Sequence, residues 1–135
     1  MPTTVREIRG SMSNIEVDTE LIFPNVQTCL AVVALCGTQL VGAHVTLGDR
    51  GRLVAVAAEL ARRFGAPNAL YVVGPIHSGG YNVSSFANFG GVPHICNVAG
   101  FIDVRAQLIA GAVTFESRPT SGGAWAAIPD ANFLS

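Results

Sequence analysis

The chain has 135 residues, of which half are hydrophobic and 13% are charged. Soluble domains average roughly 25% charged residues, so little charged surface covers the fold, and we expect a single domain that forms a homo-oligomer. Eight basic residues stand against nine acidic ones, and no basic cluster lies among aromatics, which argues against nucleic-acid binding. No apolar run has the roughly 18 residues of a membrane span, and the N-terminal residues lack the apolar stretch of a signal peptide. The sequence therefore predicts a cytoplasmic protein that does not enter a membrane.

A strand with one solvent-facing side is predicted over residues 15–23, where apolar and polar residues alternate at the start. Residues 29–36 and 39–47 are then almost entirely apolar, and Gly37-Thr38 between them is typical turn material. We interpret these two segments as a β-hairpin that is buried on both faces.

A helix is predicted next, with Asp49 as its N-cap and apolar residues spaced by three and four up to Phe64. Gly65 and Pro67 end it. Residues 69–73 form a short β-rich run, so strand, helix and strand make a βαβ unit with parallel strands. Packing of the helix explains why the hairpin is apolar on both sides.

Glycine, proline and asparagine punctuate residues 74–100, which we expect to be a long loop with a functional role. A short second helix is predicted over residues 103–110, capped by Asp103 and stopped by Gly111. Residues 112–116 are typical of a strand. The predicted fold is α/β: a layered mixed β-sheet with a central Cys-His hairpin and helices packed on it.

The hairpin turn determines which side chains become neighbours. A two-residue turn on Gly37-Thr38 fixes the cross-strand partners: Cys36 with Gln39, Ala31 with His44, and Cys29 with Thr46. Cys29 and His44 then share a sheet face, offset diagonally. A four-residue turn gives the same pairing, whereas an uncorrected three-residue turn would send the two side chains to opposite faces.

A thiol becomes a useful nucleophile when a neighbouring imidazole takes its proton. Cys29 and His44 are placed for this chemistry, at the open end of the hairpin where we expect Cys29 to be reachable. The Thr46 hydroxyl lies across from Cys29 and is close enough to hydrogen-bond the imidazole. A purely structural role explains the same three residues equally well. Cys29 would be a small buried hydrophobe, His44 a core histidine and Thr46 a good strand former.

The long loop contains further candidates. We expect the segment His77, Ser78, Gly79 and Gly80 to contact a substrate. Its glycines do not precede the Lys-Ser/Thr of a phosphate-binding loop. His77, His94 and Cys96 are candidate zinc ligands, but their spacing matches no known zinc motif, and we predict no metal site. The odd number of cysteines favours free thiols.

Two short stretches around Cys29 and His44 resemble a known family. Thr28-Cys29-Leu30-Ala31-Val32, a turn, and Gly42-Ala43-His44-Val45-Thr46-Leu47 are similar to the core of the chemoreceptor glutamine deamidase (CheD) family. The later order of helix, strand, Gly-rich loop, short helix and strand is also similar. In that family a cysteine on one strand and a histidine on the next hydrolyse glutamine side chains, and the matching positions are Cys29 and His44.

The resemblance implies that the Cys29 thiolate attacks a carboxamide carbon and that His44 transfers the protons. The implied partner is a protein substrate that presents a glutamine side chain, and no metal or organic cofactor is required. The alternative is a non-catalytic ligand-binding or oligomeric interaction module, in which aromatic residues such as Phe86, Phe89 and Trp125 form a pocket or subunit contact.

Overall fold

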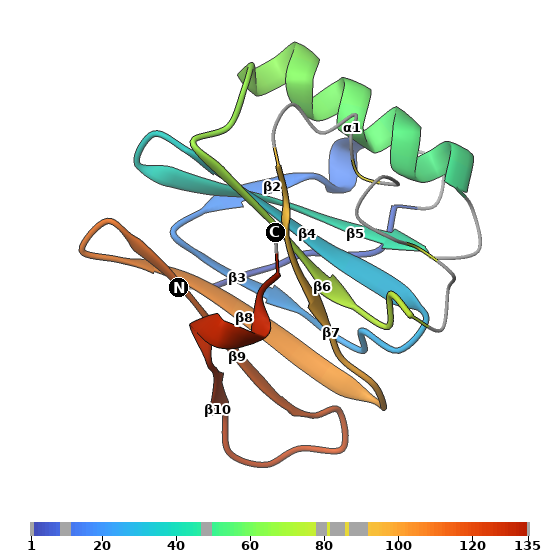
Figure 1. Ribbon diagram of the computed structural model, residues 1–135, viewed down its shortest axis with the longest axis vertical. Coiled ribbons are helices and arrows are strands. Elements are labelled where there is room, and N and C mark those ends of the chain that lie inside the picture. The colour runs from blue at the N-terminus through green and yellow to red at the C-terminus, as the bar shows by residue number, and fades with distance from the viewer. Residues whose placement is uncertain are drawn as a thin grey trace.

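The computed structural model is a sandwich of two mixed β-sheets with one α-helix on its outside (Figure 1). It describes residues 2–8, 12–46, 50–77, 81, 86 and 92–134. In Figure 1 the three layers lie one above the other, with helix α1 (Arg50–Phe64) on the second sheet and the first sheet beneath it. No helix in these described ranges is both long and apolar enough to cross a membrane.

The first sheet joins the N-terminal and C-terminal parts of the chain. Its strands, in spatial order, are β1 (Thr3–Thr4), β3 (Glu20–Phe23), β8 (Ile102–Ile109), β9 (Ala112–Pro119) and β10 (Ala126–Ile128). β1 and β3 are parallel, and the other neighbours are antiparallel.

The second sheet contains the residues of the predicted hairpin. Its strands, in spatial order, are β2 (Glu16–Asp18), β5 (Gln39–Thr46), β4 (Cys29–Cys36), β6 (Ala69–Gly74) and β7 (His94–Asn97). β6 and β7 are parallel, and the other neighbours are antiparallel. Short 3-10 helices, η1 (Met12–Asn14) and η3 (Asp130–Asn132), lie near the two ends of the chain.

The predicted pairing of β4 with β5 is confirmed. The register pairs Cys36 with Gln39, Ala31 with His44 and Cys29 with Thr46. The two faces of this hairpin enter different cores. Leu30, Val32, Ala43 and Val45 pack on the α1 side, whereas Ala31 and Val33 belong to the core between the sheets. Because side chains alternate along a strand, Cys29 and His44 lie on the face toward the first sheet.

The predicted helix is also confirmed. α1 buries Leu53, Val56, Ala57 and Leu60 against the second sheet. It ends at Phe64, and Gly65 follows with a φ of 71°, a left-handed conformation that glycine adopts without steric cost. β5 and β6 are each antiparallel to β4 and hence parallel to one another, as a βαβ unit requires, with β4 between them. The predicted cap Asp49 lies outside the described residues.

The predicted second helix is wrong, because residues 102–109 form strand β8. Val104 and Ala106 are fully buried between the sheets, and this alternating burial is the pattern of a strand. Ala110 and Gly111, with φ values of 51° and 82°, form the tight turn of a hairpin to β9 rather than a helix stop. A single α-helix, not several, therefore packs on the sheets within the described residues.

Two further boundaries differ from the prediction. The strand expected over residues 15–23 is two strands, β2 and β3, which belong to different sheets and meet at Thr19. The segment expected to be loop from 74 to 100 contains strand β7, whose pairing with β6 extends the second sheet. Both differences come from long-range pairing, which local alternation of residue types does not encode.

Candidate functional site

The N-terminal segment passes from one sheet to the other and brings Glu7 beside the hairpin. Thr3 and Thr4 pair with β3 in the first sheet, whereas Glu7 forms a parallel bridge with His44 of β5. The backbone N–H of Ile8 donates to the His44 carbonyl at 2.9 Å. Val5 and Ile8 are both buried and secure this crossing, so the position of Glu7 is set by the packing on either side of it.

Glu7 is the main polar contact of the Cys29 thiol. Cys29 Sγ donates a hydrogen bond to Glu7 Oε1 at 2.9 Å, and the Thr28 hydroxyl lies 3.9 Å from the same sulfur. The Cys29 residue is only 2% exposed, so the expectation that it is openly reachable is wrong. The thiol is covered, and its hydrogen points at a carboxylate.

This environment keeps the thiol protonated. Burial raises the pKa of Cys29, and the hydrogen bond to Glu7 and the negative charge of Glu7 raise it further, to about 11. An anion is disfavoured both by loss of water and by a neighbouring like charge. In the resting protein the Cys29 side chain is therefore a thiol at neutral pH.

His44 is held in the tautomer that leaves one nitrogen free. Its Nδ1 lies 3.2 Å from the carbonyl oxygen of Val5, which is an acceptor, so Nδ1 carries the hydrogen and Nε2 presents a lone pair. Nε2 is buried and has no hydrogen-bond partner in the described part of the chain. Burial lowers the pKa of His44, opposed by the Val5 hydrogen bond and by the charge of Glu7. The imidazole is thus a neutral base.

Thr46 contacts the carboxylate rather than the imidazole. Its Oγ1 donates to Glu7 Oε1 at 3.4 Å, whereas the sequence predicts a hydrogen bond to His44. Glu7 Oε1 therefore accepts hydrogen bonds from both Cys29 and Thr46, which are cross-strand partners. The structure brings all three predicted catalytic residues to one end of one sheet face and adds Glu7 to them.

A cavity of about 400 Å³ adjoins this cluster. Glu7 and His44 line it together with Arg6, Asn14 and Pro24. Asn14 also donates to the backbone carbonyl of Glu7 at 2.8 Å. The volume lies within the range of small-molecule sites. Cys29 is not among the described lining residues, and its hydrogen-bond partner Glu7 stands between the thiol and the cavity.

The loop before Cys29 is anchored by Asp103 of β8. Asp103 Oδ1 accepts hydrogen bonds from the Asn25 backbone at 2.9 Å and from the Thr120 hydroxyl at 3.0 Å, and Oδ2 accepts from Arg118 at 3.1 Å. Burial alone would raise the pKa of Asp103, but these hydrogen bonds outweigh it and the pKa is lowered. The residue expected to cap a helix therefore fixes the approach to the candidate nucleophile.

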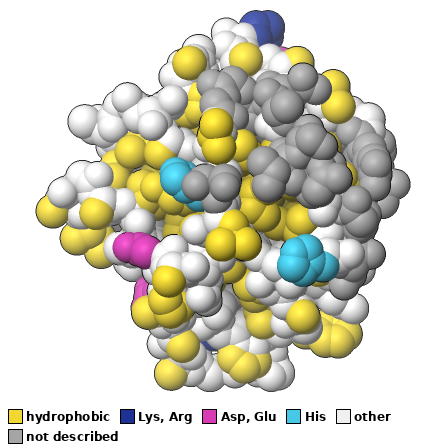
Figure 2. Space-filling model, viewed as in Figure 1, with side chains coloured by type: hydrophobic (Ala, Val, Ile, Leu, Met, Phe, Trp, Pro, Cys, Tyr) yellow, Lys and Arg dark blue, Asp and Glu magenta, His cyan; other side chains and the backbone are white. Residues whose placement is uncertain are grey.

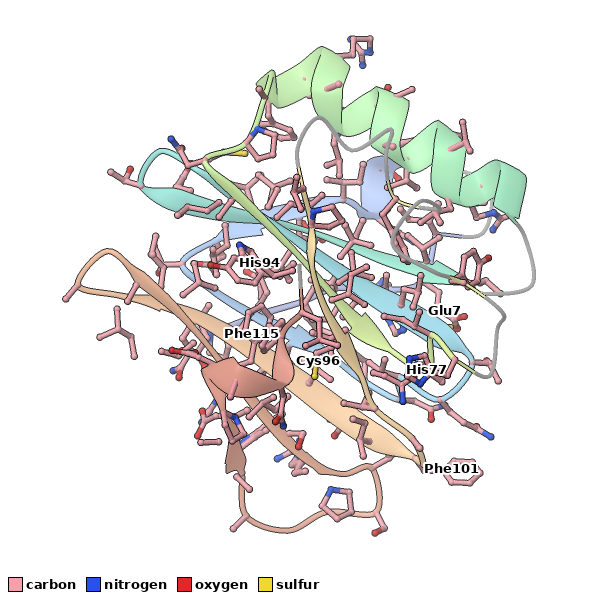
Figure 3. The ribbon with its side chains drawn as sticks, in the orientation of Figure 1. Glu7, His77, His94, Cys96, Phe101 and Phe115 are labelled. Atoms are coloured by element: carbon pink, nitrogen blue, oxygen red, sulfur yellow. The ribbon has the colours of Figure 1, made fainter. Side chains whose placement is uncertain are left out.

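His77 lies toward the same end of the sandwich as Glu7 (Figure 3). It follows β6, whose last residue Gly74 packs against Cys29 so closely that an added Cβ would lie 2.7 Å from the Cys29 carbonyl oxygen. The His77 side chain is exposed, and its backbone N–H donates to Asn97 at 2.9 Å. Ser78, Gly79 and Gly80, the other predicted substrate contacts, lie outside the described residues.

The candidate zinc ligands are not gathered into a site. His94 stacks on Tyr71 at a centroid distance of 5.1 Å, whereas Cys96 is buried between the sheets and His77 is exposed; Figure 3 labels all three histidine and cysteine positions. Within the described ranges, no three His, Cys, Asp or Glu side chains lie close enough to hold a metal ion.

Phe86 and Trp125, two of the aromatic residues that the sequence suggests for a binding pocket, have different environments in the structure. Phe86 is fully buried on the α1 side of the second sheet. Trp125 lies against the guanidinium groups of Arg105 and Arg118, at 4.7 and 4.4 Å. Phe89 lies outside the described residues. These three side chains therefore do not define a common pocket in the described structure.

The sequence matches no protein-family model and has no significant match among curated proteins. The resemblance of the segments around Cys29 and His44 to glutamine deamidases therefore stays a prediction. Functional inference depends on the geometry of the site itself.

Glu7 is the site residue that sequence reasoning missed. It lies far from Cys29 in the chain, and its neighbours Arg6 and Ile8 form no recognised motif with it. The available sign was the pair of apolar residues Val5 and Ile8 near the N-terminus, which indicates a buried segment but does not say which strand it joins.

Proposed function

We propose that this protein is a thiol-dependent amidohydrolase that resembles protein-glutamine deamidases, with Cys29 as nucleophile and His44 as base. The observation that carries the proposal is the buried Nε2 of His44, which has no partner among the described residues, in a side chain that lines a cavity together with Glu7, whose carboxylate holds the Cys29 hydrogen. A buried histidine used only for packing would normally have both nitrogens satisfied. An unpartnered ring nitrogen at a cavity is instead suited to proton transfer.

The reaction has two halves. His44 takes the thiol proton, and the Cys29 sulfur attacks the carboxamide carbon. The C–N bond breaks as His44 returns the proton to the leaving ammonia, which leaves a thioester on Cys29. Water then attacks the thioester carbon, and His44 takes its proton and delivers it to the departing sulfur. The products are a carboxylic acid, ammonia and the regenerated thiol.

The first proton transfer is unfavourable in the resting state. Burial and Glu7 raise the pKa of the thiol to about 11, whereas burial lowers the pKa of the imidazole, so transfer of the proton from Cys29 to His44 is uphill. It also means that displacement of the Glu7 hydrogen bond, for example by a substrate amide that binds the carboxylate, would accelerate the reaction.

The test is ammonia release from glutamine-rich protein substrates such as casein. We expect activity in the wild type, loss in Cys29→Ser and loss in His44→Ala. Cys36→Ser is the matched control, because Cys36 is a free, partly buried cysteine on the same strand but outside the site. Intact-mass detection of an acyl-enzyme would identify the thioester directly. Equal ammonia release by wild type and Cys29→Ser would contradict the proposal.

A second candidate is a non-catalytic ligand-binding module. The raised pKa and the 2% exposure of Cys29 favour it, because nucleophilic cysteines usually have lowered pKa values. This alternative predicts no ammonia release from any glutamine substrate and no effect of Cys29→Ser on ligand binding in the cavity. The mass-spectrometric search for an acyl-enzyme separates the two candidates.

A further inference from the structure

A second cavity, of about 390 Å³, lies at the opposite end of the strands from Cys29. Its lining includes Tyr71 of β6, His94 of β7, Phe115 of β9, and Asp130 and Phe133 from the C-terminal segment. Figure 2 shows a histidine within a largely apolar region of the surface, with an acidic side chain nearby. This cavity shares no described lining residue with the cavity beside Glu7 and His44.

The rings around this cavity meet at different angles. Tyr71 is stacked with His94 at an interplanar angle of 30°, but it stands at 89° to Phe133, with centroids 5.7 Å apart. Phe115 lies 5.2 Å from Tyr71 and 4.9 Å from Phe133. Figure 3 shows His94 and Phe115 on facing layers of the sandwich. Tyr71 and Phe133 are thus packed edge to face, and the aromatic surface that this cluster presents to the cavity can attract an organic ammonium group.

The charged side chain that lines the cavity is negative, which is the sign that attracts a cation. Asp130 is the acidic residue of the lining, and no lysine or arginine is among the described lining residues. Its carboxylate is near enough to the rings to act on them, since burial and the charge of Asp130 both raise the pKa of Tyr71. A ligand held here would contact aromatic faces and one negative charge together, which favours a cation with apolar substituents over a neutral molecule or an anion.

We propose that the cavity lined by Tyr71, Phe115, Phe133 and Asp130 binds a small quaternary ammonium compound of the size of choline. The methyl groups would lie against the aromatic lining of the cavity, and Asp130 would neutralise the charge. The cavity volume fits a free small molecule, and this site is independent of the chemistry proposed at Cys29.

Calorimetric titration of the whole chain with choline tests the proposal at about pH 8, above the ordinary titration range of histidine. The comparison ligand is the uncharged isostere of choline, in which carbon replaces the ammonium nitrogen. We expect choline to bind at least about ten-fold more tightly than this isostere. Equal affinity for the two, or no binding of choline at millimolar concentrations, would overturn the proposal. Binding to phosphatidylcholine vesicles without binding to free choline would also overturn it.

Variants assign the binding to this cavity. Asp130→Asn removes the charge of an exposed side chain and is expected to weaken choline binding about ten-fold without changing affinity for the isostere. Glu16→Gln, on edge strand β2, removes a negative charge at the far side of the second sheet and should leave binding unchanged. Phe133→Leu keeps an apolar side chain but removes a ring, and we expect weaker choline binding while circular dichroism shows that the fold is retained. Unchanged affinity in both Asp130→Asn and Phe133→Leu would show that choline binds elsewhere.

Discussion

Replacement of Glu7 by glutamine is expected to lower the pKa of the Cys29 thiol. In the wild type that pKa lies about two units above its ordinary value of 9.0, because of burial, the hydrogen bond to Glu7 and the charge of Glu7. Glu7→Gln removes the charge and supplies an amide N–H that can donate to a thiolate. Burial, the largest cause, remains. We therefore expect recovery of about one of the two units, to a pKa near 10.

The effect on reactivity is smaller than the effect on the pKa. One unit gives about ten-fold more thiolate at pH 8, but a less basic thiolate is intrinsically slower by about three-fold. The net expectation is an increase of about three-fold in the alkylation rate of Cys29. The midpoint of the pH profile is consequently a sharper measurement than the rate at a single pH.

The assay is iodoacetamide labelling between about pH 7 and 11, with peptide fragmentation in the mass spectrometer to separate Cys29 from Cys36. Circular dichroism at each pH shows that the fold persists. Glu16→Gln is the control for loss of one negative charge elsewhere on the protein. A Cys29 midpoint of about 9 in the wild type, or the same midpoint in wild type and Glu7→Gln, would refute the argument that Glu7 holds the thiol protonated.

Stability at alkaline pH gives an independent measurement. All eight basic residues are arginines, which stay charged below about pH 12. Burial also raises the pKa values of Cys36, Cys96 and Tyr71, but their contributions are common to the wild type and Glu7→Gln, so the difference between the two proteins reports on Cys29. Because the folded pKa of Cys29 lies above the unfolded one, its stabilisation is complete below pH 9 and is lost as the pH rises through 11. Two units correspond to at most about 2.7 kcal/mol. Between pH 9 and 11, the free energy of unfolding of Glu7→Gln, measured by urea denaturation, should fall by about half as much as that of the wild type.

Other predictions concern the supports of the site. Asp103→Asn should lower the free energy of unfolding at neutral pH by about 1–3 kcal/mol, measured by urea denaturation. Because the pKa of Asp103 is lowered in the folded protein, the difference from the wild type should shrink as the pH falls below about 4. A difference that stays constant with pH would contradict a stabilising role for the Asp103 carboxylate. Gly74→Ala should destabilise the protein by about 1–3 kcal/mol, since its Cβ would meet the rigid Cys29 carbonyl. Gly42→Ala should cost less, because the nearest atoms there are side chains of Leu21 and Phe23.

The parts of the fold that the sequence predicted are those with strong local patterns. The Gly37-Thr38 turn sets Cys36 opposite Gln39. Each residue further along one strand then pairs with one further along the other, which places Cys29 opposite Thr46. The apolar spacing of α1 and Gly65 at its end predicted the helix equally well. Local turn chemistry and periodicity were sufficient wherever the partner segment was close in the chain.

The errors come from patterns that fit two structures. Residues 103–110 have a plausible cap and a plausible stop, yet Val104 and Ala106 point into the core between the sheets and Arg105 pairs across the strands with Glu116. Gly111 serves a hairpin as well as it would end a helix. The contribution of Glu7 depends on a parallel bridge to β5 that joins distant parts of the chain, and no local feature of the sequence specifies that bridge.

The hydrogen bond from Cys29 to Glu7 makes the resting state of the proposed active site differ from that of most thiol enzymes. In most thiol enzymes the imidazole holds the nucleophile ready before substrate arrives, whereas here the thiol donates a hydrogen bond to a carboxylate and His44 Nε2 has no partner among the described residues. A substrate amide N–H is a competing donor for Glu7 Oε1, and its binding would free the sulfur to turn toward His44. Activation would then depend on a carboxamide being present, which predicts that Glu7→Gln raises alkylation by iodoacetamide yet lowers the rate of ammonia release. Parallel changes in both rates would instead assign Glu7 a purely inhibitory role.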